Sequence, residues 1–357
     1  MPIAGTNIGL DTTEGIDKIS YTEKVTSPYL SDGATELLGA SVISESLHDT
    51  NEGYYFGISN SSTATTPEFH VAYGNVNGYG GNTYSGTIKS PTEVIYKSFA
   101  SLALTPSEVT GGFKISSPGS DSAVAAGKDD SIFVLLANRA LMKDRINKKN
   151  WTIALSGSTS ATAVGATILE LTDDSSNDSP TPTPLGNRYN IVSGSDGTIA
   201  KAATVKTYGW FYPDHGMMIF SGAELSASMP GNHSDLDDVI IFDDDSHKGF
   251  ATTALVANNY NQALKFVNCL QPTGAKLKFR NEEDQVSAQY FCRLKSGHCN
   301  FSSNPTFVSG SQNELRHTSM KSNPTTYITE VQLYNSTGDI VAVGALSTPL
   351  KKNFSSE

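Results

Sequence analysis

The segment from residue 276 to 357 alternates strand-like runs with polar turns, and this pattern restricts the possible fold more than any other feature of the chain. Residues 327–334 and 340–346 are rich in β-branched and aromatic side chains, and the five residues between them contain Gly338. Such runs fit a pleated, half-exposed surface, and a short polar link with glycine predicts a hairpin turn. The segment therefore predicts β-hairpins that pack against other surfaces, and it contains no catalytic motif.

The composition favours a β-rich fold for the rest of the chain as well. Only 17% of the 357 residues are charged, and 31 are glycine. Glycine, serine, threonine and asparagine serve turns and exposed strand faces, so their abundance is typical of sheet proteins. The chain is long enough to bury a sizeable core.

Two segments predict the main helices. Ser90, Pro91 and Glu93 form a capping box with proline at the first helical position, which predicts a helix over about 91–104. A second helix is predicted over about 253–270, and residues 138–147 predict a further short helix. The predicted buried stripe of the second helix comprises Leu255, Asn259, Ala263, Phe266, Val267 and Leu270.

Apolar runs between these helices predict strands that do not alternate with helices as a doubly wound sheet requires. We therefore expect a β-rich α+β fold with several antiparallel sheets or hairpins, two main helices and long polar loops. The expected divisions are an extended N-terminal arm over 1–30, a β-rich α+β domain over 31–250, and a helix with β-hairpins over 251–357 that acts as a docking module. The predicted strands cover residues 54–58, 69–73, 131–137, 151–155, 166–171, 188–192, 206–212 and 217–220.

The charge pattern argues against nucleic acid as a partner. The net charge is -11, and basic residues cluster only over residues 143–149. Phosphate backbones are bound by clustered lysine and arginine. No apolar run reaches the ~18 residues of a membrane-spanning helix, and residues 1–5 do not begin a signal-peptide pattern of basic and then apolar residues, so we expect synthesis in a cytoplasm without membrane insertion.

An acidic loop over residues 235–245 is the first candidate for a metal site. Carboxylate oxygens are the ligands that calcium prefers. The loop lacks the glycine at position six and the closing glutamate of the twelve-residue calcium loop, so a solvated acidic loop is the favoured interpretation. Its acidic side chains are Asp235, Asp237, Asp238, Asp243, Asp244 and Asp245.

The three cysteines offer a second candidate, a zinc site. Cys292, His298 and Cys299 lie close together in the sequence, and Cys269 lies upstream. Structural zinc sites present two cysteines separated by two to four residues, and that spacing is absent. Buried core positions for Cys269 and Cys292 are the favoured interpretation, and no cofactor or metal is expected.

Hydrolase motifs are incomplete. Residues 194–197 approach the Gly-x-Ser-x-Gly pattern at Ser195, but the serine is one position short and no helix follows it. Ser156 and Ser158 are predicted in a polar loop, and His215 in a turn. We therefore expect no catalytic residues and no enzyme.

The aromatic residues over 54–84 allow a further hypothesis, a sugar-binding platform, because aromatic rings stack on the apolar faces of ligands. Aromatic residues more often fill a β core, which is the favoured interpretation. The glycine-rich stretch over 78–86 is predicted to be a surface loop, because it matches no phosphate-binding pattern.

Several segments resemble virion structural proteins of T4-like marine cyanophages, which are contractile-tailed myoviruses. The most distinctive is residues 138–157, NRALMKDRINKKNWTIALSG; residues 171–176, 188–195 and 206–213 and the hairpin segments near the C-terminus are similar to others. The likeness extends from about residue 24 to the end. It implies a phage tail component of the virion, in the baseplate or a part attached to it, and it brings no catalytic residues.

Three functions therefore stand as hypotheses. The first is a structural protein that assembles with other virion tail or baseplate proteins, in several symmetric copies per particle. The second is a receptor- or glycan-binding tail protein that uses the aromatic loops over 54–84. The third and least favoured is a polysaccharide-degrading tail enzyme, which would need two carboxylates facing one cleft.

Overall fold

The computed structural model confirms the expected fold class: a β-rich α+β chain built from antiparallel sheets. In the described residues, two α-helices accompany these sheets, α1 (Pro91–Ala103) and α2 (Gly222–Ser228). The structure describes residues 18–46, 55–60, 66–78, 91–108, 112–115, 128–158, 166–200, 205–228 and 263–356, the last range without residues 264, 265, 268, 272, 292, 293, 299, 301–304 and 313.

The chain divides into two compact units. The body comprises Lys24–Gln285, and the hairpin unit comprises Met1–Glu23 together with Val286–Glu357. The boundary falls within β1 (Lys18–Pro28) and β16 (Arg280–Tyr290), which are neighbours in one small sheet. Part of the expected N-terminal arm is thus strand β1, and the residues before it lie outside the described residues.

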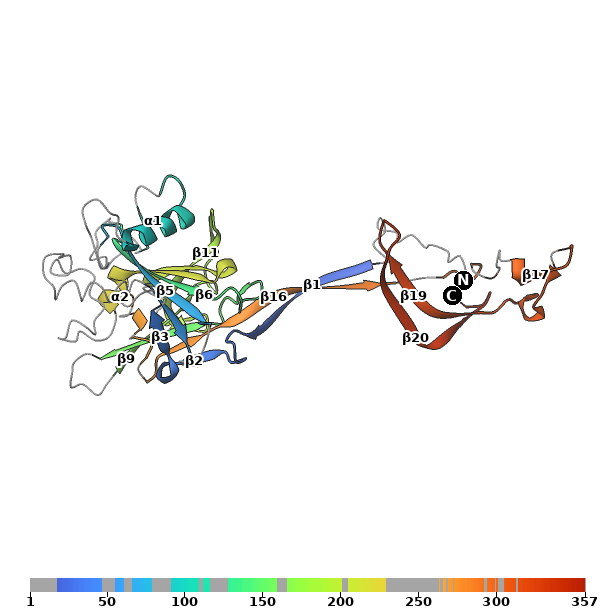
Figure 1. The fold of residues 1–357 in the computed structure, drawn as a ribbon, viewed down its shortest axis with the longest axis horizontal. Coiled ribbons are helices and arrows are strands. Elements are labelled where there is room, and N and C mark those ends of the chain that lie inside the picture. The colour runs from blue at the N-terminus through green and yellow to red at the C-terminus, as the bar shows by residue number, and fades with distance from the viewer. Residues whose placement is uncertain are drawn as a thin grey trace. The chain divides into compact units, whose positions relative to one another are not determined.

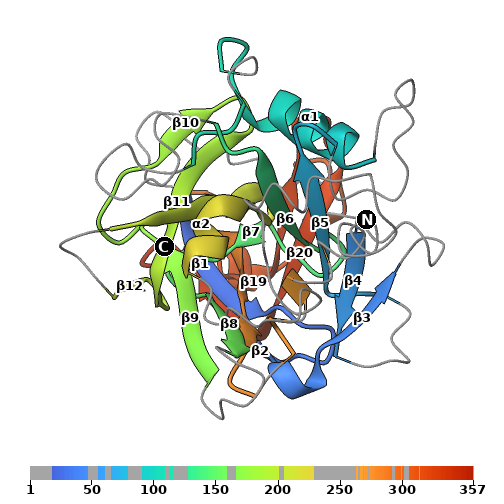
Figure 2. The same ribbon diagram turned by 90° about the vertical axis from the view of Figure 1, so that its left-hand side faces the viewer.

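One large antiparallel sheet forms most of the body, and its strands curve around the core (Figures 1 and 2). Its order is β2-β15-β8-β9-β11-β13-β14-β6-β5-β4-β3, with β10 and β12 attached to β11. The strands are β2 (Glu36–Leu38), β3 (Ile43–Ser46), β4 (Tyr55–Ser59), β5 (Phe69–Asn75), β6 (Ser131–Ala137), β8 (Thr152–Ser158), β9 (Ala166–Asp173), β10 (Thr181–Thr183), β11 (Gly186–Ser195), β12 (Thr198–Ile199), β13 (Thr207–Tyr212), β14 (Met217–Ser221) and β15 (Lys276–Lys278).

The central strands of this sheet are buried on both faces. Along β6, Phe133 and Leu135 belong to the larger hydrophobic cluster, whereas Ile132 and Val134 belong to the smaller one. Successive side chains of a strand point to opposite faces, so this alternation places one cluster on each side of the sheet. It explains why β6 reads as an uninterrupted apolar run in the sequence.

Helix α1 supplies much of the smaller cluster. It begins at Pro91, as the capping box predicts, and buries Tyr96, Ala100 and Ala103. It packs against β5 and lies beside this strand in Figure 2. Gly74 of β5 permits the approach, because a Cβ there would lie 3.0 Å from the backbone nitrogen of Tyr96.

Aromatic rings pack together in the larger hydrophobic cluster around Phe279, the residue between β15 and β16. Trp151 stacks on Phe279 with ring centroids 5.6 Å apart and an interplanar angle of 9°. Phe69 contacts Phe279 from another side at 5.0 Å, and Tyr29 contacts Phe69 at 4.9 Å. Such packed rings stabilise beyond the apolar area they bury, so Phe279 fixes the segment just before β16.

The hairpin unit has two small sheets in its described residues. Strands β17 (Val308–Ser309) and β18 (Glu314–Leu315) pair, as do β19 (Thr326–Tyr334) and β20 (Ile340–Lys352). The predicted turn over residues 335–339 is confirmed; there, the Asn335 side chain accepts hydrogen bonds from the backbone N–H groups of Thr337 and Asp339. These bonds specify the hairpin locally.

The three predicted helices have different outcomes. The helix over 91–104 is confirmed as α1. The prediction over 138–147 is wrong: Asn138 accepts the Ala140 N–H with its side chain, which starts a turn, and β7 (Arg145–Ile146) pairs with β16. Tertiary strand pairing here overrides the apolar spacing. The prediction over 253–270 lies mostly outside the described residues; Ala263, Phe266 and Val267 are helical and buried there. Helix α2 was not predicted.

Candidate functional site

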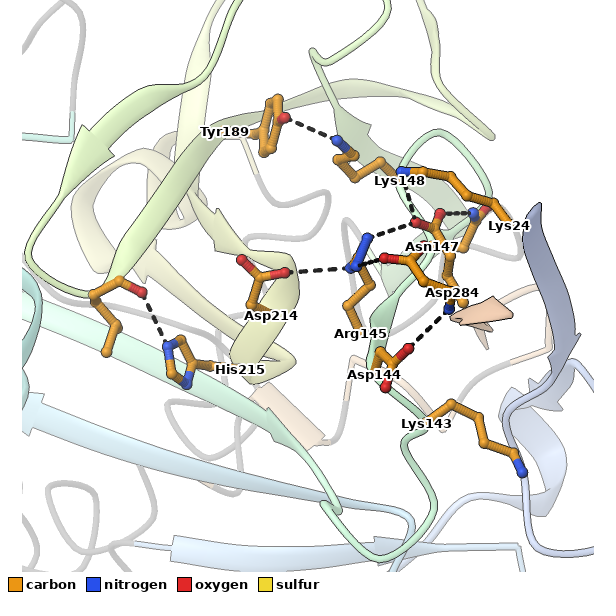
Figure 3. A network of polar contacts seen from close by, with 12 residues as sticks. Lys24, Lys143, Asp144, Arg145, Asn147, Lys148, Tyr189, Asp214, His215 and Asp284 are labelled. Atoms are coloured by element: carbon orange, nitrogen blue, oxygen red, sulfur yellow. Dashed lines mark hydrogen bonds and ion pairs between the residues drawn. The ribbon is translucent and has the colours of Figure 1, made fainter. Parts of the chain in front are cut away.

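The densest polar cluster of the described residues lies where β7 meets β16 (Figure 3). We call it the Arg145 network, and it comprises Lys24, Arg145, Asn147, Asp214, Glu282 and Asp284. The antiparallel register places Arg145 opposite Glu282 and Ile146 opposite Asn281. Cross-strand neighbours of opposite charge stabilise such a pair.

Arg145 faces three carboxylates from two directions. Its Nη1 lies 3.0 Å from Glu282 Oε1, its Nη2 bonds the Asp284 carboxylate, and its Nε lies 3.4 Å from Asp214 Oδ1. Asp214 comes from the short 3₁₀ turn Pro213–His215 that links β13 to β14. The planar guanidinium presents five N–H donors, which suits it to bind several carboxylates at once.

Glu282 is held from its other side as well. Lys24 Nζ of β1 lies 3.2 Å from Glu282 Oε1, and the side-chain amide of Asn147 donates to Oε2. Burial raises the pKa of Glu282, but the hydrogen bonds from Lys24 and Asn147 and the charges of Lys24 and Arg145 outweigh it and lower the pKa below its ordinary value. Glu282 therefore stays ionised near neutral pH.

Backbone bonds extend the same contact. Asp284 N–H donates to the Asp144 carboxylate at 2.8 Å, and Asn147 N–H donates to the Arg280 carbonyl at 2.8 Å. Asp144 N–H donates to the Glu282 carbonyl at 3.2 Å. These bonds join residues 144–147 to the first half of β16 within the body.

The chemistry of the Arg145 network is that of a clamp. Its cations and carboxylates neutralise one another, and Glu282, its most buried carboxylate with a side chain 5% exposed, accepts three donors. A general acid or base needs a pKa moved towards the working pH, whereas the pKa of Glu282 moves away from it. The contacts of the network fix the geometry of the strands that carry it.

A second polar centre surrounds the buried Asp129. Its carboxylate accepts the Ser221 hydroxyl and the Ile115 N–H, the latter at 2.7 Å, and its carbonyl accepts the Tyr96 hydroxyl. Burial raises the pKa of Asp129, and the nearby Glu224 raises it further. These bonds tie residues 112–115 to the sheet and to α1, which is a structural role.

The candidate hydrolase residues occupy separate places. Ser195 Oγ at the end of β11 lies 3.1 Å from Thr152 Oγ1 at the start of β8, and the carboxylate of the adjacent Asp196 forms an ion pair with Lys278 at 2.7 Å. His215 is exposed, and its Nε2 lies 3.0 Å from the Leu185 carbonyl. Ser156 is buried in β8. The bonds of Ser195 and His215 do not connect them.

The candidate metal sites are only partly covered by the structure. The acidic loop over 235–245, Cys292 and Cys299 lie outside the described residues. Cys269 is buried in the larger hydrophobic cluster, as expected for a core position. Among the residues that are described, no three histidine, cysteine, aspartate or glutamate side chains gather closely enough to hold a metal ion.

Most of the described aromatic residues of the proposed sugar platform are core residues, and Tyr55 is half-buried. Phe56, Phe69 and Tyr73 are at most 7% exposed. Tyr54, Tyr79 and Tyr84 lie outside the described residues. These three rings therefore fill the sheet interior and are not available for stacking on a ligand.

The hairpin β19–β20 carries six large apolar side chains that are more than half exposed. We call this set the hairpin surface, and its exposures run from 52% at Tyr334 to 68% at Val341. Contiguous exposed apolar patches mark interaction sites in soluble proteins. The alternating strand pattern predicted a packing module here. The hairpin surface comprises Tyr327, Tyr334, Ile340, Val341, Val343 and Leu350.

Two further findings complete the description. In the described parts of the chain, no helix has the length and apolar character needed to cross a membrane. Comparison with family models, curated proteins and solved structures found no significant match to this chain.

Proposed function

We propose that this chain is a structural protein of a contractile-tailed phage virion, placed in the baseplate or the adjoining part of the tail. It assembles with neighbouring tail proteins, in several symmetric copies per particle, and it catalyses no reaction. The proposal rests on the resemblance of residues 138–157 and other segments to virion proteins of T4-like cyanophages, and on the exposed apolar hairpin.

The hairpin unit is the observation that carries the assembly role. Its two-stranded sheets are too small to be stable alone, because an isolated hairpin is marginally stable in water. Of its described residues, only Pro324 and Lys352 are buried. A unit of this kind becomes ordered when neighbours cover it, which is the property required of an assembly protein.

The Arg145 network supports the same role from the body. It holds the first half of β16 with charged and backbone contacts at a point where the chain passes from the body to the hairpin unit. A strand that is bonded at several points is firmly held in the body, which suits a protein that assembles with neighbours.

The alternative, a receptor- or glycan-binding tail protein, receives less support. It needs exposed aromatic rings over 54–84, and Phe56, Phe69 and Tyr73 of that region are buried. A polysaccharide-degrading enzyme would need a pair of carboxylates facing one cleft. The buried carboxylates Asp129 and Glu282 instead bond backbone groups and cations.

The test is the protein content of purified particles. Particles of a phage that encodes this chain are banded on a density gradient, and their proteins are quantified by mass spectrometry against the major tail protein. We expect the chain in intact particles at a fixed whole-number ratio, retained after washing with high salt. A chain abundant in the infected lysate and absent from washed particles would refute the proposal.

A further inference from the structure

We infer that the hairpin surface is an interface between copies of this same chain, so that the hairpin unit completes its core by self-association. The inference rests on the proposed assembly role and names one partner within it. Four properties of the described hairpin unit lead to a second copy as the occupant: its missing core, its two apolar faces, its balanced charge and its apolar area.

The missing core is the first property. The two hydrophobic clusters of the described chain draw all their members from the body, and none comes from the hairpin unit. Fixing the backbone of one residue on folding costs about 1–2 kcal/mol of conformational entropy, and the burial of apolar side chains must offset this cost. The strands of the hairpin therefore need burial that the described unit does not supply itself.

The two faces of the hairpin are the second property. Leu333 pairs with Ala342, and the neighbouring pair Gln332 and Val343 points to the opposite face. Tyr334 and Ile340 form a further pair at the turn end. Apolar side chains thus occur on both faces, whereas a hairpin lying on one partner surface would carry them on one face only. Packing between repeated copies offers each hairpin neighbours on both sides.

Charge is the third property, and it distinguishes a second copy from an oppositely charged partner. The hairpin unit holds seven basic and eight acidic residues, whereas the body holds 18 basic and 28 acidic residues. A balanced unit can meet itself without net repulsion, and the excess negative charge lies in the body. An interface built for a charged partner would instead carry one sign of charge.

Area is the fourth property. Six aromatic side chains of the unit are between 40% and 62% exposed. At roughly 150–250 Å² for each ring, covering them would bury on the order of 500 Å² per copy. The exposed aliphatic side chains bring this towards the ~800 Å² per partner of a standard stable interface. The aromatic residues are Tyr21, Tyr290, Phe291, Tyr327, Tyr334 and Phe354.

The test is the mass of the purified full-length chain in solution, measured by sedimentation velocity and light scattering over a hundredfold range of concentration. One copy has a mass of 38.0 kDa. We expect a discrete species at a whole-number multiple of that mass. A chain that stays at 38.0 kDa up to 100 µM overturns the inference.

A triple variant tests the surface. Ile340→Thr, Val341→Thr and Val343→Thr keep β-branched side chains and replace apolar groups by hydroxyls, so strand propensity is retained. We expect the dissociation constant between copies to rise at least a hundredfold. The control is Val94→Thr with Val205→Thr, two exposed valines of the body, which should leave the mass distribution unchanged.

The outcomes separate the inference from the proposed function. A multimer that the hairpin variant leaves intact overturns the inference, and so does a monomer whose hairpin binds a different tail protein. Either result leaves the virion assignment standing when the chain is found in washed particles. A multimer that the hairpin variant dissociates supports the inference even when the particles lack the chain, which would refute the virion assignment alone.

Discussion

Arg145 and Glu282 form an ion pair, with Nη1 3.0 Å from Oε1, across 137 positions of the chain. The two residues are direct cross-strand partners in the antiparallel pairing of β7 with β16. Glu282 has a side chain only 5% exposed, so the pair is largely withdrawn from water on that side. The pair matters for the fold because removing the cation would leave a buried, uncompensated carboxylate, which lowers the free energy of unfolding.

Replacing Arg145 by methionine should destabilise the body. Methionine retains much of the apolar stem but leaves Glu282 with Lys24 as its remaining cation. We expect the free energy of unfolding to fall by about 2 kcal/mol, less than the ~3–5 kcal/mol of a fully buried broken pair. Urea unfolding measures this free energy. Replacing the exposed Lys143 by methionine is the control, and its free energy of unfolding should stay within ~0.5 kcal/mol of the parent. Equal losses of stability in both variants would contradict a stabilising role for the Arg145 network.

Glu282→Gln should change how stability depends on pH. The folded pKa of Glu282 lies below its ordinary value of 4.5, so its contribution is present above that value and is lost as pH falls through the folded pKa. We therefore expect the stability of the variant minus that of the parent to become more negative as pH rises through this window. Urea unfolding between pH 3 and 6 gives the difference, and a constant difference would count against ionised Glu282 as a partner of Arg145.

Asp129→Asn should act with the opposite sign. Burial raises the folded pKa of Asp129 above its ordinary value of 3.8, so the folded chain binds more protons in that window and loses stability as pH rises through it. Asparagine does not titrate. We expect the stability of this variant minus that of the parent to become more positive as pH rises through the window, and the same titration of unfolding measures it. If this stability difference instead became more negative as pH rises, as expected for Glu282→Gln, Asp129 would not be a desolvated carboxyl.

Lys352→Met should loosen the hairpin unit. Lys352 is buried, and its ammonium donates to the Ser296 carbonyl at 2.9 Å, to the His298 carbonyl, and to Asn300 Oδ1 at 2.8 Å. A hydrogen bond from a charged donor contributes roughly 1.5–3 kcal/mol, and the variant loses all three. We expect hydrogen exchange at residues 295–300 to accelerate roughly tenfold or more. The neighbouring exposed Lys351→Met is the matched control; equal acceleration in both would remove Lys352 from this role.

Much of the fold could be predicted from local pattern. The capping box at Ser90 to Glu93 located the start of α1, and the apolar run over Ser131–Ala137 coincides with β6. Residues 138–147 failed because helical spacing of Leu141, Met142 and Ile146 also fits a turn followed by a strand. Which of the two forms depends on β16, a strand more than a hundred residues away, and a single sequence does not display that pairing.

The candidate site was less accessible to prediction for the same reason. The basic run over 143–149 and the acidic run near Glu282 are both visible, but their register opposite one another arises from sheet pairing. Burial of Phe56, Phe69 and Tyr73, in contrast, agrees with the β-core location that the sequence favoured. Exposure of the hairpin surface follows from the missing core of its unit, which only the folded chain reveals.

The most direct test of the central claim, that neighbouring copies complete the hairpin unit, is hydrogen exchange of β19 and β20 at high and at low protein concentration. We expect the amides of both strands to be strongly protected at high concentration and to lose at least tenfold protection on dilution, while β6 and β14 in the body stay unchanged. Equal, strong protection of β19 and β20 in a dilute monomer would contradict the account, because the hairpin would then be stable without a neighbour.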